Sequence, residues 1–525
     1  MLNNKKILLV FNTVKYLKFK QIFYRVYYYF KQRLPFKFKK GSENFNVNHI
    51  NFTLYLYNKK SYLGNNKFTF VNIEHLFKKN IDWNINIYGK LWTYNLNYFD
   101  YLLQNDITKD DGIKLIKNFI ENKKIIDGLE PYPISLRGIN WIIFISQHKI
   151  NDDEINKTLF KHYQILQNNL EYHLLGNHLL ENAFSLLFAA LFFNNQNFLN
   201  KSIKILFTEL NEQILEDGAH FELSPMYHQI ILKKLLDAIN LLQENSSLDT
   251  DDLYLFLRNK AKKMLSWLEN ITFRNGDIPM FNDSAYDIAP TSDDLIYYAK
   301  KLNINWKLIK TAIINYKLFR FNKFEIAIDM AQIGASYQPG HAHADTFTFV
   351  LYYENQPVIV DPAVSTYNIG KIRNRERSTF YHNTVCINKQ NSSEIWGGFR
   401  VGKRAKVTIL NQSKNKISGL HNGYKKIKHI RKFYLKEEQI EIIDIINKKE
   451  IQAQACLHIH PDRNIIFNKK EKTIIIENVQ IKFEHFNNIK IENYYFAKGF
   501  NNLILSKKIV ISFNNTLTTK INFLP

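Results

Sequence analysis

The sequence predicts an α+β protein in which a helical region precedes an antiparallel β-sandwich. First, the 525 residues exceed the ~250–300 that one hydrophobic core organises. Second, apolar residues recur at spacings of three and four from about residue 100 to 315, and at a spacing of two after Phe321. Third, 45% hydrophobic and 14% aromatic residues are typical of a folded chain rather than a disordered one.

Helical periodicity is clearest in residues 111–124, 179–193, 229–243 and 257–271. Short polar breaks separate these segments, so each helix has to bury one face against its neighbours. This pattern favours a bundle, a solenoid or a closed α/α toroid.

Strand periodicity follows in residues 323–334, 346–361, 404–410, 440–449 and 472–486. Because sandwiches protect their apolar faces by stacking sheets, we expect stacked sheets here. The predicted organisation is a basic helical or extended segment (1–88), a helical domain (89–320) and a β domain (321–525).

The net charge of +23 attracts anionic partners. Nucleic acid, an acidic membrane surface and an acidic glycan all fit this charge, as does a surface of solvated lysines. No nucleic-acid-binding motif occurs, so we do not expect that partner. The two cysteines, Cys386 and Cys456, allow one bridge at most and exclude a cysteine-based metal site.

Residues 1–40 contain eleven Lys or Arg and no acidic residue, interleaved with Tyr and Phe. This composition suits a helix on an anionic membrane surface. The alternative is an ordinary packed helix with a solvated basic face. The short apolar run at 7–11 lacks a small-residue cleavage site, so we expect a protein that is cytoplasmic or peripheral to the inner membrane face.

A polar cluster opens the apolar helix at 174–193. Asn177 and His178 lie within one turn of Glu181 and share a face with it. Polar residues also gather at helix ends for capping alone, so the spacing by itself leaves both interpretations open.

Ser224 followed by Pro225 predicts the start of a second helix. Tyr227 then falls in the first turn, where the helix dipole favours a developing phenolate and hence proton transfer. Packing is the commoner role for a tyrosine in a helix.

A third cluster is the segment "GHAHAD", in which His341 and His343 share a side of an extended chain. With Asp361 and His382 further along, the segment supplies a His/Asp/His set that suits zinc and leaves a position for water. Histidine pairs at this spacing also occur by chance.

Together these segments resemble the heparinase II/III-like family of polysaccharide lyases. The resemblance covers most of the chain, through the segments "GKLWTYNLNYFDYL", "LEPYPISLRGINWI", "GNHLLENAF", "DGAHFELSPMYH", "NGDIPMFNDSA", "GHAHADTFTF", "RSTFYHNTV" and "WGGFRVGKRAKV". It implies an incomplete α/α toroid followed by a β-sandwich, with the active site between the two.

By position, the resemblance implies that Asn177 and His341 contact the substrate carboxylate, while His178 and Tyr227 transfer protons. The remaining positions it implies are Glu181 and Arg404, as accessory substrate-binding residues, and His343, Asp361 and His382, as ligands of a structural zinc ion.

These residue types suit β-elimination on a uronate-containing polysaccharide. A base removes the C5 proton, donors stabilise charge on the carboxylate, and an acid protonates the departing O4. Uronate C5 epimerisation needs the same first step and stays open, as does a non-catalytic glycan-binding or assembly role. We expect an acidic poly- or oligosaccharide as partner, connected with surface polysaccharides such as capsule or O-antigen.

Overall fold

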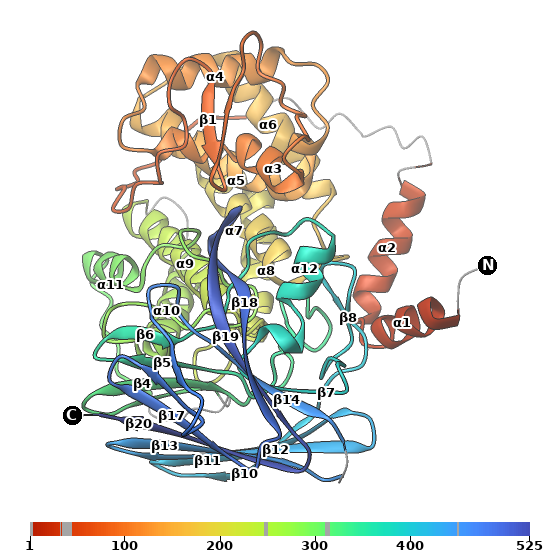
Figure 1. The fold of residues 1–525 in the computed structure, drawn as a ribbon. Helices are drawn as coiled ribbons and strands as arrows, with labels where there is room; N and C mark the ends of the chain where they lie inside the picture. Colours follow the sequence, from red (N-terminus) through yellow and green to blue (C-terminus); the bar gives the residue numbers. More distant parts are fainter. Residues whose placement is uncertain are drawn as a thin grey trace.

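The computed structural model describes residues 4–31, 33, 45–245, 250–309, 316–448 and 451–524. A helical layer and a sheet layer lie against each other, with the helices at the top and the strands at the bottom of Figure 1. The predicted fold class, helices followed by antiparallel sheets, is confirmed. The toroidal path of the helices and the three domain boundaries stay predictions.

The helices of the described residues, apart from the short α12, form the first part of the chain. Their bounds are α1 Asn4–Val14, α2 Phe19–Lys31, α3 Lys90–Tyr98, α4 Lys109–Glu121, α5 Pro131–Gln147, α6 Asp153–Asn168, α7 Gly176–Phe192, α8 Gln196–Gln213, α9 Pro225–Glu244, α10 Asp251–Ile271, α11 Ser292–Lys301 and the short α12 Lys371–Glu376. In α5 and α7 almost every residue is buried, so these two helices form the centre of the helical layer. None of the helices described combines the length and the apolar character of a membrane span.

The strands follow, apart from one early hairpin. Their bounds are β1 Lys67–Phe70, β2 Ile73–Leu76, β3 Tyr316–Arg320, β4 Phe324–Asp329, β5 Phe349–Tyr353, β6 Gln356–Ile359, β7 Val385–Ile387, β8 Ile395–Trp396, β9 Arg400–Val401, β10 Val407–Gln412, β11 Lys416–Tyr424, β12 Ile427–Lys436, β13 Gln439–Ile446, β14 Ala453–His458, β15 Ile466–Asn468, β16 Thr473–Ile476, β17 Val479–Glu484, β18 Asn488–Gly499, β19 Asn502–Phe513 and β20 Thr516–Phe523. Buried and half-buried residues alternate along all of β13, which is the predicted period of two.

Three antiparallel sheets build the sandwich. An eight-stranded sheet has the order β10-β11-β12-β13-β20-β17-β16-β15, and two four-stranded sheets have the orders β3-β4-β5-β6 and β18-β19-β14-β7. One apolar core contains Phe349, Phe433 and Ile511, one residue from each sheet. The large sheet therefore stacks against both small ones. Cys386 and Cys456 are free thiols.

The sheet layer also contacts the helical layer directly. The long β18–β19 hairpin rises from the sheets toward the helices (Figure 1). At its tip, the carbonyl of Phe500 accepts from Asn72 Nδ2 at 2.9 Å, and Asn501 Nδ2 donates to the carbonyl of Val71 at 2.9 Å. Phe500 belongs to the same apolar core as the helices, so the two layers share buried surface.

Candidate functional site

His341 and His343, in the loop between β4 and β5, share one buried acceptor, Asp283. Nδ1 of His341 lies 2.9 Å from Oδ2 of Asp283, and Nε2 of His343 lies 2.8 Å from Oδ1. Arg373 of α12 donates to both oxygens, with Nη2 2.6 Å from Oδ2. Burial alone would raise the pKa of Asp283, but Arg373 and the two imidazoles lower it well below its usual range. Asp283 is thus an ionised anchor for both rings.

Tyr227 lies in the first turn of α9, where the sequence predicts it. Ser224 caps this helix: its Oγ accepts from the Tyr227 N–H at 3.3 Å and donates to the carbonyl of Asp283 at 2.9 Å. The Tyr227 ring lies over His341, with 3.9 Å between ring centroids. The cap therefore connects the helix that carries Tyr227 to the anchor that holds His341.

The phenol of Tyr227 is held in its protonated form. Burial, followed by the neighbouring Tyr367 hydroxyl at 3.3 Å, raises the Tyr227 pKa well above its usual value. This direction is opposite to the expected effect of the helix dipole, because desolvation of the partly buried phenolate outweighs the dipole. At neutral pH the side chain is a proton donor.

His178 lies at the start of α7 and is oriented by Glu171. The chain enters α7 through Leu175 at φ 60° and ψ −152°, a strained conformation for a residue with a Cβ. Across this bend, Glu171 Oε1 lies 3.0 Å from Nδ1 of His178, while its Oε2 accepts from Asn182 at 3.0 Å. Burial lowers the pKa of His178, but Glu171, together with Glu222 and Glu181, raises it more, so the net shift is upward. The side chain of His178 is 34% exposed and thus reaches solvent.

The buried carboxyl of Glu222 lies among the remaining groups. Its Oε2 is 3.7 Å from Nε2 of His341 and has no hydrogen-bond partner among the described residues. Burial raises the Glu222 pKa, opposed by His341, His178 and a hydrogen bond from the backbone of Asn177. A Cβ at Gly176 would lie 3.2 Å from Oε1 of Glu222, so the glycine permits this close approach.

The structure therefore gathers the four predicted residues, Asn177, His178, Tyr227 and His341, around Glu222 and Asp283. They come from α7, α9 and the loop before β5, so both layers contribute. Their chemical roles stay predictions at this point.

The two accessory residues make other contacts. Glu181 is buried and forms an ion pair with Lys234 of α9 at 3.1 Å. Arg404 lies 3.8 Å from the centre of the Tyr16 ring and donates to the carbonyl of Ser336. Their substrate-binding roles stay predictions.

A second cluster, suited to a metal ion, lies beside the site. Potential ligand atoms of His343, Asp345 and His382 all lie within 4.8 Å of one another, and all three side chains are buried. One atom of each, His343 Nδ1, Asp345 Oδ2 and His382 Nε2, lacks a hydrogen-bond partner among the described residues. Burial lowers the pKa of His343 to about 3, which keeps its imidazole neutral, as metal ligation requires.

Asp345, rather than the predicted Asp361, is the carboxylate of this cluster. Oδ2 of Asp361 lies 2.7 Å from Nδ1 of His382, so this carboxylate orients a histidine of the cluster. His343 is held in the same way by Asp283. Carboxylates that fix histidine ligands from behind are usual at metal sites.

Sequence reasoning missed five further residues of the site and of the neighbouring cluster: Glu171, Glu222, Asp283, Asp345 and Arg373. Glu222 and Asp283 lie within the quoted segments "DGAHFELSPMYH" and "NGDIPMFNDSA", so those segments were a signal. No sequence signal indicated Glu171, because its contact with His178 depends on the bend at Leu175.

Comparisons with known proteins show which family the chain resembles in sequence and fold. Residues 134–306 match the family model described as the heparinase II/III N-terminus, and residues 305–524 match the model described as heparinase II/III-like, C-terminal. A heparin-sulfate lyase of Bacteroides stercoris is 24% identical over 456 residues, which cover 77% of this chain and 64% of that protein. One of Pedobacter heparinus is 23% identical over 333 residues, which cover 58% and 49%. The chain thus spans less than two thirds of the length of these relatives.

Solved structures share the fold. A heparinase III crystal structure superposes with a TM-score of 0.65 at 18% identity and covers 85% of this chain and 80% of that one. The heparan sulfate lyase HepC from Pedobacter heparinus gives a TM-score of 0.56 at 16% identity and covers 88% and 82%. Because the two family models together span residues 134–524, the chain belongs to the heparinase II/III-like family.

Proposed function

We propose that the protein is a polysaccharide lyase that cleaves an acidic, uronate-containing glycan by β-elimination. The observation that carries this proposal is the contact between the rings of Tyr227 and His341, whose centroids lie 3.9 Å apart, beside Asn177, His178 and the buried Glu222. Proton-transfer groups and carboxylate-binding groups thereby lie side by side. The names of the relatives, which are heparin-sulfate lyases, support the same reaction class.

In this mechanism, Asn177 and His341 receive the uronate carboxylate and stabilise the charge that develops on it. A charged Glu222 would repel that carboxylate. Its raised pKa favours the uncharged form, so burial of Glu222 makes room for a second acid group.

His178 and Tyr227 divide the proton transfers. His178, exposed to solvent and oriented by Glu171, is the group we assign to removal of the C5 proton. Tyr227 keeps its proton at neutral pH, which suits it to protonate the departing O4. The positive net charge of +23 favours the encounter with a polyanion.

For the neighbouring cluster we propose a structural zinc ion held by His343, Asp345 and His382. The three unpartnered buried ligand atoms support this assignment, because N and O ligands suit zinc. When bound, the ion would supply rigidity to the loop that carries His341. We expect His382→Ala to abolish zinc binding, measured by elemental analysis, and Asp361→Asn to weaken zinc affinity by about 10- to 100-fold. Wild-type protein without zinc after purification in zinc-supplemented medium would contradict this assignment.

The reaction is tested with purified protein and a panel of acidic polysaccharides, capsule and O-antigen preparations included, in deuterated water. A lyase yields shorter chains that carry an unsaturated uronate, detected by near-ultraviolet absorbance. Deuterium incorporation at C5 without cleavage would instead indicate an epimerase. Binding without either change would indicate a non-catalytic glycan-binding protein.

A further inference from the structure

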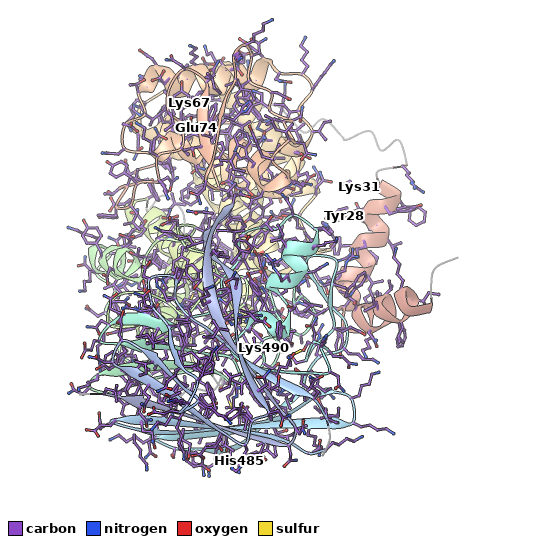
Figure 2. All side chains as sticks on the ribbon, viewed as in Figure 1. Tyr28, Lys31, Lys67, Glu74, His485 and Lys490 are labelled. Atoms are coloured by element: carbon purple, nitrogen blue, oxygen red, sulfur yellow. The ribbon has the colours of Figure 1, made fainter. Side chains whose placement is uncertain are left out.

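The two N-terminal helices pack against the body of the protein with their polar sides. In α2, Gln21 Nε2 donates to the carbonyl of Leu174 at 3.0 Å, and the Tyr28 hydroxyl donates to the carbonyl of Leu170. Lys31 Nζ donates to the carbonyl of Asn168 at 2.6 Å. The three side chains share one face of the helix, since they are spaced at seven and three residues. Figure 2 labels Tyr28 and Lys31 on this helix, at the edge of the molecule.

The opposite face of α2 is apolar and exposed. Phe19, Phe23, Val26 and Phe30 follow one another at spacings of four, three and four, and their exposed fractions are 81%, 52%, 51% and 55%. Helices on globular proteins normally bury such a stripe. An exposed continuous apolar stripe of this kind marks a binding surface.

Helix α1 repeats the arrangement. Its polar face contacts the sheet layer, where Thr13 Oγ1 accepts from Trp396 Nε1 at 3.1 Å and Asn12 donates to Glu394 at 3.4 Å. Its exposed large apolar residues are Ile7, Leu8, Val10, Phe11 and Val14. Both helices therefore present apolar side chains away from the protein.

The charge around these apolar faces has one sign. Lys6, Lys20 and Arg25 are exposed on the two helices and Lys15 is exposed directly after α1, and no acidic residue precedes Glu43 in the sequence. Basic residues flanking an apolar, aromatic-rich face are typical of helices that lie in the surface of an anionic bilayer. A second copy of the chain would bring the same positive charges together, which disfavours self-association.

We propose that the exposed faces of α1 and α2 form one docking surface for an anionic lipid bilayer. The packed face of α2 contacts the loop at 168–174, which contains Glu171 and leads to His178. Docking would thus hold this loop about one helix diameter, ~10 Å, from the lipid surface. This inference concerns attachment and is independent of the proposed lyase chemistry.

The test is sedimentation of the full-length protein with vesicles of phosphatidylcholine mixed with phosphatidylglycerol, and with vesicles of phosphatidylcholine alone. We expect sedimentation with the anionic vesicles, much less with the neutral ones, and a decrease with added salt. The variant F19S/F23S/F30S should lose at least tenfold in affinity. The variant K6E/K15E should lose about fivefold or more for each charge.

Matched controls exist elsewhere on the surface. Ile126 is 72% exposed, so I126S removes an exposed apolar side chain away from α1 and α2, and K78E/K79E reverses two exposed charges. Both should sediment like wild type. Equal sedimentation of wild type and F19S/F23S/F30S, or no sedimentation of wild type, would overturn the proposal. So would light scattering that shows a wild-type dimer which the triple serine variant abolishes, since a second copy would then cover this face.

Discussion

Asp283→Asn should destabilise the protein by an amount that the hydrogen bonds of Asp283 define. Each oxygen of this buried carboxylate accepts one bond from Arg373 and one from a histidine, either His341 or His343. Asparagine has one acceptor oxygen and one amide nitrogen, which only donates. Whichever way the side chain turns, the amide nitrogen faces one arginine N–H and one histidine N–H. Two charge-assisted bonds, each contributing about 1.5–3 kcal/mol, are then lost.

The expected loss of stability from these two bonds is about 3–6 kcal/mol. Removal of one partner from a buried ion pair costs a similar amount, about 3–5 kcal/mol. We therefore expect the free energy of unfolding, measured in urea, to fall by about 3–5 kcal/mol at an unchanged slope. Activity per folded molecule should also fall, because His341 loses the acceptor that fixes its ring.

Asp444→Asn is the matched control. Asp444 is equally buried and accepts from Arg431 Nε at 2.7 Å and Nη2 at 2.9 Å and from His429 Nε2 at 2.7 Å, within the eight-stranded sheet. It should lose similar stability while its folded molecules keep wild-type activity. If Asp283→Asn changed stability by less than ~1 kcal/mol, or if both variants lost activity alike, Asp283 would not be the residue that anchors His341.

Three further outcomes are expected. Tyr227→Phe should lower kcat by about a hundredfold or more with little change in KM, and an unchanged kcat would remove the phenol from the mechanism. Since Glu171 raises the pKa of His178, the rising limb of the pH profile of kcat/KM should lie above pH 6.5, and Glu171→Gln should move it to lower pH; an unmoved limb would exclude His178 as the base. Burial raises the Asp444 pKa, but Arg431 and His429 lower it more, to about 2. The stabilisation that ionised Asp444 gives the folded protein should therefore be complete above pH 3.8 and disappear as the pH falls toward 2. Urea titrations in which wild type and Asp444→Asn show the same pH dependence would refute this.

The fold was largely readable from the sequence because local periodicity reports which face of an element is buried. The period of two that begins at residue 440 became β13, Gln439–Ile446, with its alternating burial. The Ser224-Pro225 pair marked the first turn of α9 because capping is a local interaction. The four central site residues came from the family resemblance, which carries information that spacing alone does not.

The missing parts of the site depend on contacts between distant segments. Glu171 orients His178 only because the chain bends sharply at Leu175. Asp283 and Arg373 are ninety residues apart in sequence, so no periodicity connects them. The direction of the Tyr227 pKa depends on burial by the whole fold, whereas the helix dipole is a local property; the local argument therefore pointed the wrong way.

The position of Asp283 explains how a zinc ion held by His343, Asp345 and His382 would affect the neighbouring site without contacting the substrate. One oxygen of its carboxylate holds His341, which we assign to the substrate carboxylate, and the other holds His343, which we assign to zinc. A movement of His343 would shift Asp283, and Arg373 is too deeply buried to follow without losing its own bonds. Loss of zinc should therefore misplace His341 through one shared carboxylate, so that activity falls together with metal content.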